Sequence, residues 1–152
     1  MFGNTQQVAE AIAGGFTVAD TKLLNVSEAT PADLKEINLL LVGSPTQGGR
    51  AKPTTLEFLN QIPAGALAGI GVAAFDTRFA EKRQNFALRM LMKMINFAAP
   101  KIAKTLVSKG GKLVAPPEGF FVLGSKGPLQ EGELERAAVW AKNLIMNIQN
   151  NK

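Results

Sequence analysis

Apolar residues follow two alternating patterns along this chain. Short continuous apolar runs are typical of strands covered on both faces of a parallel sheet. Together with the bounding turn residues they predict strands near 20–26, 39–43, 71–76 and 112–122. Between these runs apolar residues recur at helical spacing, which predicts helices near 5–13, 30–35, 52–62, 100–109 and 131–148. Strands that alternate with helices predict an α/β fold, a three-layer sandwich with helices on both faces of a parallel sheet.

Two stretches leave alternatives open. Residues 112–122 contain Pro116-Pro117, so they form either one last strand broken by the prolines or a strand with an edge extension. Residues 81–99 carry a methionine-rich apolar stripe that ends at Pro100. Packing in the core or in a homodimer is favoured for this stripe over a helix that lies on a membrane surface.

The most informative junction follows the predicted strand at 39–43. Leu39–Val42 lead directly into the polar, glycine-rich segment Gly43-Ser44-Pro45-Thr46-Gln47-Gly48-Gly49, which we expect to be a loop. Open α/β sheets bind ligands at the carboxyl ends of their strands. Ser44, Thr46 and Gln47 would supply hydrogen-bonding groups there, whereas the alternative is an ordinary connection to the next helix.

A second candidate site lies at the start of the chain. Gly3-Asn4-Thr5 stand immediately before a helical pattern of apolar residues. A helix start of this kind leaves backbone N–H groups free and adds the partial positive charge of the helix dipole, so it suits a phosphate group. Asn and Thr are also ordinary helix caps, which is the alternative interpretation.

Taken together, these segments resemble the flavodoxin-like family. In that family a loop of the form Ser/Thr-x-x-Gly-x-Thr opens the first helix, and a Ser-Pro-Thr-aromatic-Gly-Gly loop follows the third strand. A third loop follows the fourth strand, and here it would be Asp76-Thr77-Arg78-Phe79, after the apolar run Gly71–Phe75. The resemblance covers essentially the whole of residues 1–152 and implies one flavodoxin-like domain, a doubly wound parallel sheet with strand order 2-1-3-4-5.

The resemblance implies that FMN is the cofactor. Its phosphate would lie on the N–H groups of Gly3, Asn4 and Thr5, and its ring between two loops. The residues implied for the ring are Ser44, Pro45, Thr46, Gln47 and Gly48 from one loop, and Asp76, Thr77, Arg78 and Phe79 from the other. Gln47 stands where the family has an aromatic residue, so stacking falls to Phe79. Arg78 would stabilise a reduced, anionic flavin, or Asp76 would instead hydrogen-bond through its loop.

The chain also departs from the family at its start. The family's central first strand delivers the phosphate loop, but Met1 already lies inside that loop. Three explanations are open: upstream residues are missing from this sequence, the sheet re-pairs, or a segment of another chain fills the gap. We expect residues 1–152 to bind FMN weakly or not at all, and an added upstream strand of about six apolar residues to restore binding.

Composition narrows the chemistry. The 152 residues, 46% of them hydrophobic, suffice for one domain with a substantial core. The chain has no histidine, cysteine or tyrosine, which excludes imidazole and thiolate metal sites and the commonest catalytic bases and nucleophiles. An organic cofactor that carries the reactivity suits such a chain. No apolar run is long enough to span a membrane, no secretory signal is visible, and the absence of cysteine fits the cytoplasm.

Positive charge is concentrated in residues 78–112. This segment holds nine basic residues and one acid, whereas the whole chain has a net charge of +5. Such a segment attracts an acidic protein, a nucleic acid or a membrane surface, or is simply a solvated helix face. Within a flavodoxin-like protein we expect an acidic redox partner rather than a nucleic acid, although flavodoxins are commonly acidic themselves.

Three functions fit these observations. The first is an FMN-binding electron-transfer domain. The second is a flavodoxin-like domain that has lost flavin binding and serves as a structural or regulatory module. The third is a flavin-dependent reductase with a nicotinamide donor, and the absence of a GxGxxG fingerprint counts against it.

Overall fold

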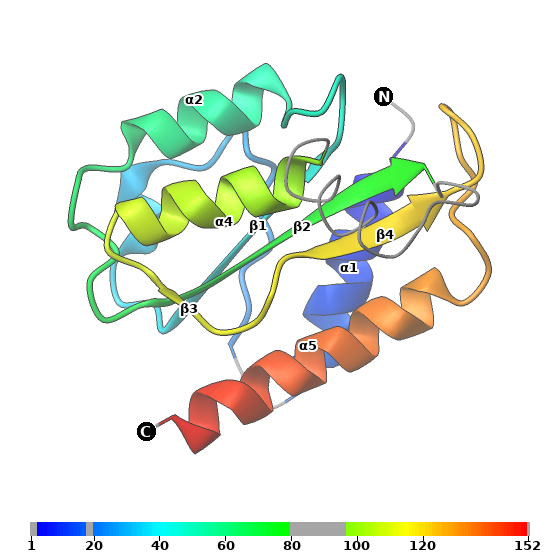
Figure 1. The fold of residues 1–152 in the computed structure, drawn as a ribbon. Coiled ribbons are helices and arrows are strands. Elements are labelled where there is room, and N and C mark those ends of the chain that lie inside the picture. The colour runs from blue at the N-terminus through cyan, green and yellow to red at the C-terminus, as the bar shows by residue number, and fades with distance from the viewer. Residues whose placement is uncertain (1–2, 18–19, 80–96, 152) are drawn as a thin grey trace, which may run out of the picture.

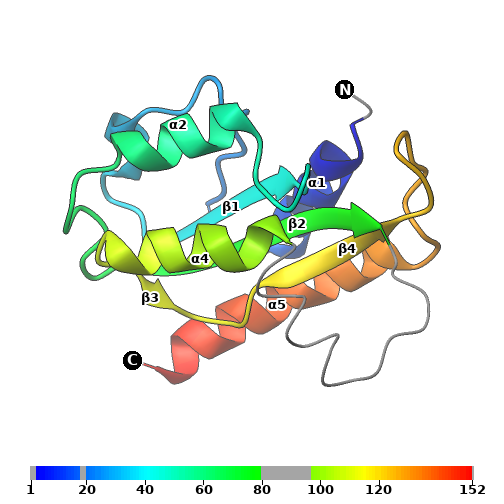
Figure 2. The ribbon, with the colours of Figure 1, turned by 45° about the horizontal axis from the view of Figure 1, so that its top comes forward.

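A parallel sheet lies between two pairs of helices in the structure, a computed structural model that describes residues 3–17, 20–79 and 97–151. Helices α1 (Asn4–Gly15) and α5 (Glu133–Asn150) cover one face of the sheet. Helices α2 (Pro53–Gln61) and α4 (Ala98–Ser108) cover the other face (Figures 1 and 2). The predicted three-layer α/β architecture is therefore confirmed.

The strand β2 (Gly71–Phe79) is the centre of the sheet. On one side it pairs in parallel with β1 (Leu39–Pro45), from Leu39 opposite Gly71 to Pro45 opposite Thr77. On its other side it pairs in parallel with two successive strands, β3 (Lys112–Leu113) and β4 (Glu118–Val122). The residues 112–122 thus form two strands along one edge, separated by the segment with Pro116-Pro117.

The strand expected at 20–26 is absent, which corrects the sequence-based prediction. Residues 20–25 have no regular structure and 26–28 form a turn. In the strand order 2-1-3-4-5 of the flavodoxin-like family, the family's second strand lies at the edge of the sheet and pairs only with the family's first strand. No strand lies on the outer side of β1 among the described residues, so the segment at 20–26 has no ladder to join. Val26 instead packs against the core between the sheet and the α2–α4 layer.

Two segments expected as loops belong to strands. Ser44 and Pro45 continue β1 beyond the strand predicted at 39–43, and Thr77–Phe79 continue β2 beyond the strand predicted at 71–76. The polar side chains misled the prediction because a strand interior usually excludes them. Here their hydrogen-bonding groups are satisfied within the fold, and the backbone of Ser44 stands opposite that of Asp76 in the ladder. Pro45 is tolerated because it is the last residue of the strand.

Two hydrophobic cores lie on opposite faces of the sheet. Toward α2 and α4 the core includes Val42, Val72 and Ile102. Toward α1 and α5 it centres on Phe75, Phe120 and Trp140, whose ring centroids lie 6.0–6.2 Å apart in edge-to-face contacts. Trp140 is therefore a packing residue. No helix in the described part of the chain is long and apolar enough to cross a membrane.

The short helix near residue 30 is a 3-10 helix, Pro31–Leu34, with Thr30 as its N-cap. Asp33 closes a capping box, because its carboxylate accepts a hydrogen bond of 2.9 Å from the Thr30 N–H. The methionine-rich stripe expected at 81–99 lies outside the described residues except for its last three positions, 97–99. Helix α4 begins at Ala98, two residues before Pro100.

Candidate functional site

The start of α1 meets the carboxyl end of the sheet through two threonines. The Thr5 and Thr77 hydroxyl groups share a hydrogen bond of 2.8 Å between their oxygens. The backbone N–H of Thr46 donates to the Thr77 carbonyl at 2.9 Å. Thr77 therefore links the first turn of α1, the end of β2 and the segment that follows β1. The structure brings together one residue from each of the three sequence-predicted site segments.

No described side chain occupies the N-terminus of α1. Gly3 is the N-cap in a left-handed conformation (φ 71°), and its carbonyl accepts the first helical bond, from the N–H of Gln7 at 2.9 Å. No side chain caps the helix, no acid lies in its first turn, and nothing described lies within 4 Å of a Cβ added to Gly3. The Asn4 side chain packs against Gly127, so the loop before α5 also borders this corner.

A tight turn follows β1. Gln47 and Arg50 exchange two backbone hydrogen bonds of 2.8 and 3.1 Å across Gly48 and Gly49. Both glycines have positive φ values, 56° and 77°, as a two-residue hairpin turn of type I′ requires. The Gln47 side chain is exposed at the corner of this turn. The turn geometry therefore accounts for both glycines.

Ser44 has a structural role at the start of α2. Its hydroxyl accepts a hydrogen bond from the Lys52 N–H and donates one to the Pro45 carbonyl, both at 2.9 Å. Ser44 is buried. Because both bonds hold neighbouring backbone in place, its hydroxyl is already used within the protein.

Asp76 and Thr46 cap the N-terminus of α4. Asp76 is fully buried, and one of its carboxylate oxygens accepts a bond of 2.8 Å from the Ala99 N–H. The Thr46 hydroxyl accepts a bond of 2.9 Å from the Ala98 N–H. Two of the backbone donors that a helix start leaves unpaired are thereby satisfied by residues from the ends of β2 and β1.

The charge of Asp76 is matched by Arg78. The guanidinium donates two hydrogen bonds to the carboxylate, 2.6 Å from Nε and 2.8 Å from Nη2, and Arg78 is only 6% exposed. The guanidinium carbon lies 3.8 Å from the centre of the Phe97 ring. On the other side the guanidinium lies against Gly119, where a Cβ would come closer to it than van der Waals contact allows. Arg78 is thus held inside the fold, and it does not contribute to the exposed basic surface expected of residues 78–112.

Phe79 differs from its neighbours because it is exposed. It is the last residue of β2, and 52% of its surface is accessible. Of the residues expected around a flavin ring, it is the aromatic one and its ring is accessible for stacking.

An ion-pair cluster joins the start of α5 to β4. The Glu133 carboxylate accepts bonds from the Phe121 N–H at 2.8 Å and from Arg136 at 2.6 and 2.8 Å. Arg136 also pairs with Glu118 at 2.9 Å and lies over the Phe120 ring. Burial raises the pKa of Glu133, but the hydrogen bonds from Arg136 and Phe121 outweigh burial, and the net pKa is lowered.

Sequence reasoning missed the residues that surround Asp76 and Arg78. Phe97, Ala99 and Gly119 come from distant parts of the chain, and nothing in their local sequence marks them as partners. One signal was available: Asp76 and Arg78 stand two positions apart, and alternate residues of a strand share a face of the sheet. An i, i+2 pair of opposite charges after an apolar run predicts a buried pair when the strand continues through it.

The fit to FMN is good at the phosphate end and partial at the ring end. The start of α1 offers backbone donors that no described side chain caps, beside the Thr5 hydroxyl, with no carboxylate in its first turn to repel a phosphate. At the ring end the side chains of Ser44, Thr46, Asp76 and Arg78 are used within the fold. Backbone groups of the 45–50 segment and the exposed Phe79 ring are what remains for a flavin.

No family model matches this sequence, and no curated protein matches it. Solved structures do. Flavodoxin 1 from Bacillus cereus is 16% identical, with a TM-score of 0.74 over 96% of this chain and 92% of that one. A flavodoxin from the domain Archaea is 19% identical, with a TM-score of 0.70 over 98% and 93%.

A longer protein contains a similar part. Rubredoxin oxygen:oxidoreductase from Desulfovibrio gigas is 16% identical with a TM-score of 0.71, and the match covers 99% of this chain but 34% of that one. Likenesses at these identities show the fold. With the parallel pairing of β1, β2 and β4 described above, they show that this chain has the flavodoxin-like fold.

Proposed function

We propose that this protein is an FMN-binding electron-transfer domain of the flavodoxin type. The observation that carries the proposal is the uncapped start of α1, tied to the carboxyl end of the sheet by the bond between Thr5 and Thr77. Unpaired backbone donors and a helix dipole at the edge where open α/β sheets take ligands suit a phosphate ester. Two of the three similar structures described above are flavodoxins.

The roles of the residues follow from the contacts. The N–H groups of Gly3, Asn4 and Thr5 and the Thr5 hydroxyl would hold the phosphate. The turn from Pro45 to Gly48 and the end of β2 at Phe79 would border the ring, with Phe79 as the stacking residue. When bound, FMN supplies the electron transfer, and the chain supplies binding, orientation and exclusion of water.

Asp76 and Arg78 enter this proposal as positioning residues. Asp76 fixes the start of α4 and is neutralised by Arg78, while Thr46 bridges the end of β1 to the same helix. Their effect on a flavin would therefore be indirect, through the backbone they hold.

A domain without flavin is the second candidate. The commitment of the Ser44, Thr46, Asp76 and Arg78 side chains to contacts within the protein favours it, as does Gln47 in place of an aromatic residue. The two candidates differ in a simple property: the purified flavin protein is yellow, and the flavin-free domain is colourless.

The electron partner that we propose is an acidic protein. Lys101, Lys104 and Lys112 are exposed on and after α4. Attraction between exposed charges is screened over about 8 Å at physiological ionic strength, so binding of such a partner should weaken with added salt.

A flavin fluorescence titration that compares FMN with riboflavin tests the site. FMN and riboflavin differ only in the phosphate, so the proposal expects tighter binding of FMN. In the protein with an added upstream strand, replacing Thr5 with Ala should weaken FMN binding by about 1–2 kcal/mol, the order expected for the loss of one hydrogen bond, and leave riboflavin binding unchanged.

The matched control is Thr54→Ala, which removes an exposed threonine from the first turn of α2. It should bind both ligands like the unaltered protein. Equal affinity for FMN and riboflavin, or equal losses in the two variants, would show that the start of α1 is not a phosphate site.

A further inference from the structure

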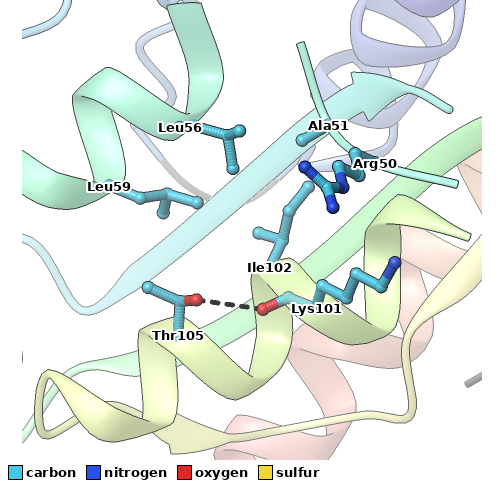
Figure 3. Close-up of a pocket in the computed structure, with 7 residues that line it drawn as sticks. All are labelled: Arg50, Ala51, Leu56, Leu59, Lys101, Ile102 and Thr105. Atoms are coloured by element: carbon cyan, nitrogen blue, oxygen red, sulfur yellow. Dashed lines mark hydrogen bonds between the residues drawn. The ribbon is translucent and has the colours of Figure 1, made fainter. Parts of the chain in front are cut away.

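A pocket of about 300 Å³ lies between α2 and α4, beside the turn that follows β1 (Figure 3). Its volume is at the lower end of the range found for small-molecule sites. No described side chain that lines it is among those proposed to hold FMN, so the pocket is open to a ligand of its own.

One end of the pocket is cationic. Arg50 comes from the turn and Lys101 from α4, and the Lys101 ammonium group donates a hydrogen bond of 2.6 Å to the Gly49 carbonyl. This bond places the Lys101 charge beside the backbone of Arg50. Neither cation takes part in an ion pair with any residue that the structure describes. Among the described residues that line the pocket, none is acidic.

The other end is apolar. Leu56 and Leu59 of α2 face Ile102 of α4 across the pocket (Figure 3). Leu59 and Ile102 are buried, whereas Leu56 is 41% exposed and forms the open wall. The pocket thus has two unpaired cations at one end and an apolar surface that water still reaches at the other.

We propose that this pocket binds a small amphipathic anion, an aliphatic carboxylate with a chain of about six carbons. The carboxylate would accept charge-assisted hydrogen bonds from Arg50 and Lys101. The aliphatic chain would cover Leu56, Leu59 and Ile102 and remove their exposed surface from water.

Hexanoate is a suitable probe, with hexan-1-ol as its uncharged counterpart. In an amide NMR titration of the isotope-labelled protein, hexanoate should shift the signals of Arg50, Lys101 and Ile102 in a saturable way. Hexan-1-ol should shift the same signals far less at equal concentration, because it lacks the charge that the cations recognise.

Two variants test the cationic and the apolar end of the pocket separately, and a third is the control. Arg50→Gln and Leu56→Asn change exposed side chains and should each weaken hexanoate binding by about threefold or more, in line with exposed charge pairs and partly exposed apolar contacts. Lys104→Gln removes an exposed lysine of α4 that does not line the pocket and should leave binding unchanged. The proposal is overturned if hexanoate produces no shifts at the pocket, if hexan-1-ol reproduces them, or if Lys104→Gln weakens binding as much as Arg50→Gln.

Discussion

Asp76 and Arg78 point to the α4 face of β2 and form a buried ion pair there. A carboxylate with no exposed surface needs both a counter-charge and hydrogen bonds, and it has them from the Arg78 guanidinium and the Ala99 N–H. Removing one partner of such a pair is costly, because it leaves the other charge buried and uncompensated.

The first prediction concerns this pair. Asp76→Ala should lower the free energy of unfolding by about 3–5 kcal/mol, since the Arg78 charge loses its partner. The double variant Asp76→Ala with Arg78→Met should be more stable than Asp76→Ala alone, because the unpaired charge is gone. Urea unfolding measures both values. A double variant less stable than the single one would mean that the ion pair is not what fixes this part of the fold.

The second prediction concerns Glu133, whose pKa is lowered below its ordinary value of 4.5 because bonds from Arg136 and Phe121 outweigh its burial. A carboxylate with a lowered folded-state pKa stabilises the protein above its unfolded-state pKa, and this stability is lost as the pH falls through the folded-state pKa. Acidification below about pH 4.5 should therefore destabilise the protein.

Glu133→Gln supplies the control for this pH dependence. Glutamine keeps an acceptor for the Phe121 N–H but does not titrate, so its free energy of unfolding should fall less between neutral pH and acid than that of the unaltered protein. Equal acid dependence in the two proteins would assign the loss of stability to other carboxylates.

At the scale of elements, α1 and α5 pack closely through small residues. A Cβ added to Gly15, the last residue of α1, would lie 2.7 Å from the Ala138 carbonyl oxygen and 2.8 Å from the Ala141 Cβ. The neighbouring Gly14 has nothing within 4 Å of such a Cβ. Two adjacent glycines in one helix therefore have opposite surroundings.

This contrast gives the third prediction. Gly15→Ala should destabilise the protein by about 1–3 kcal/mol, because the added methyl meets backbone that cannot yield without separating the helices. Gly14→Ala should stabilise it by about 0.5–1 kcal/mol, the usual advantage of alanine over glycine inside a helix. Thermal unfolding should show opposite shifts. Shifts of the same sign would contradict the close approach of α1 to α5.

The elements also show what the sequence could predict. Helices α1, α2 and α5 and the strands β1 and β2 were predicted because each carries a periodicity that its own residues determine. The strand at 20–26 was predicted wrongly, because a strand exists only with a neighbour to pair with, and pairing is not a local property. Asp76–Phe79 were assigned to a loop because their polarity conceals partners such as Ala99, more than twenty residues away.

The sequence predicted the segments of the candidate site but not the contacts between them. Glycine, asparagine and threonine before an apolar helical pattern located the start of α1, and the run at 39–43 located the end of β1. The bond between Thr5 and Thr77 spans 72 positions of the chain, and no local pattern predicts it. Nor did the sequence show that Thr46 and Asp76 hold α4, because Ala98 and Ala99 have no distinguishing side chain.

At the scale of the whole molecule, the outer edge of β1 is the feature that bears most on function. β1 pairs with β2 on one side, and none of the described residues forms a strand on its other side. The start of α1 is held at the site through the Thr5–Thr77 bond and through the buried residues Val8 and Ile12. A strand on the free edge of β1 would lead directly into that helix start and limit its motion.

The proposed function depends on the start of α1, which would bind the FMN phosphate when it is anchored to the sheet. The most direct measurement is a flavin fluorescence titration of residues 1–152 with FMN, with and without about six apolar residues added ahead of Met1 as a strand. We predict weak or no binding without the added strand and at least about tenfold tighter binding with it, since a strand ahead of Gly3 would fix the directions of the backbone donors in advance. Equally tight binding by both would show that the strand is dispensable, and no binding by either would contradict the flavin site itself.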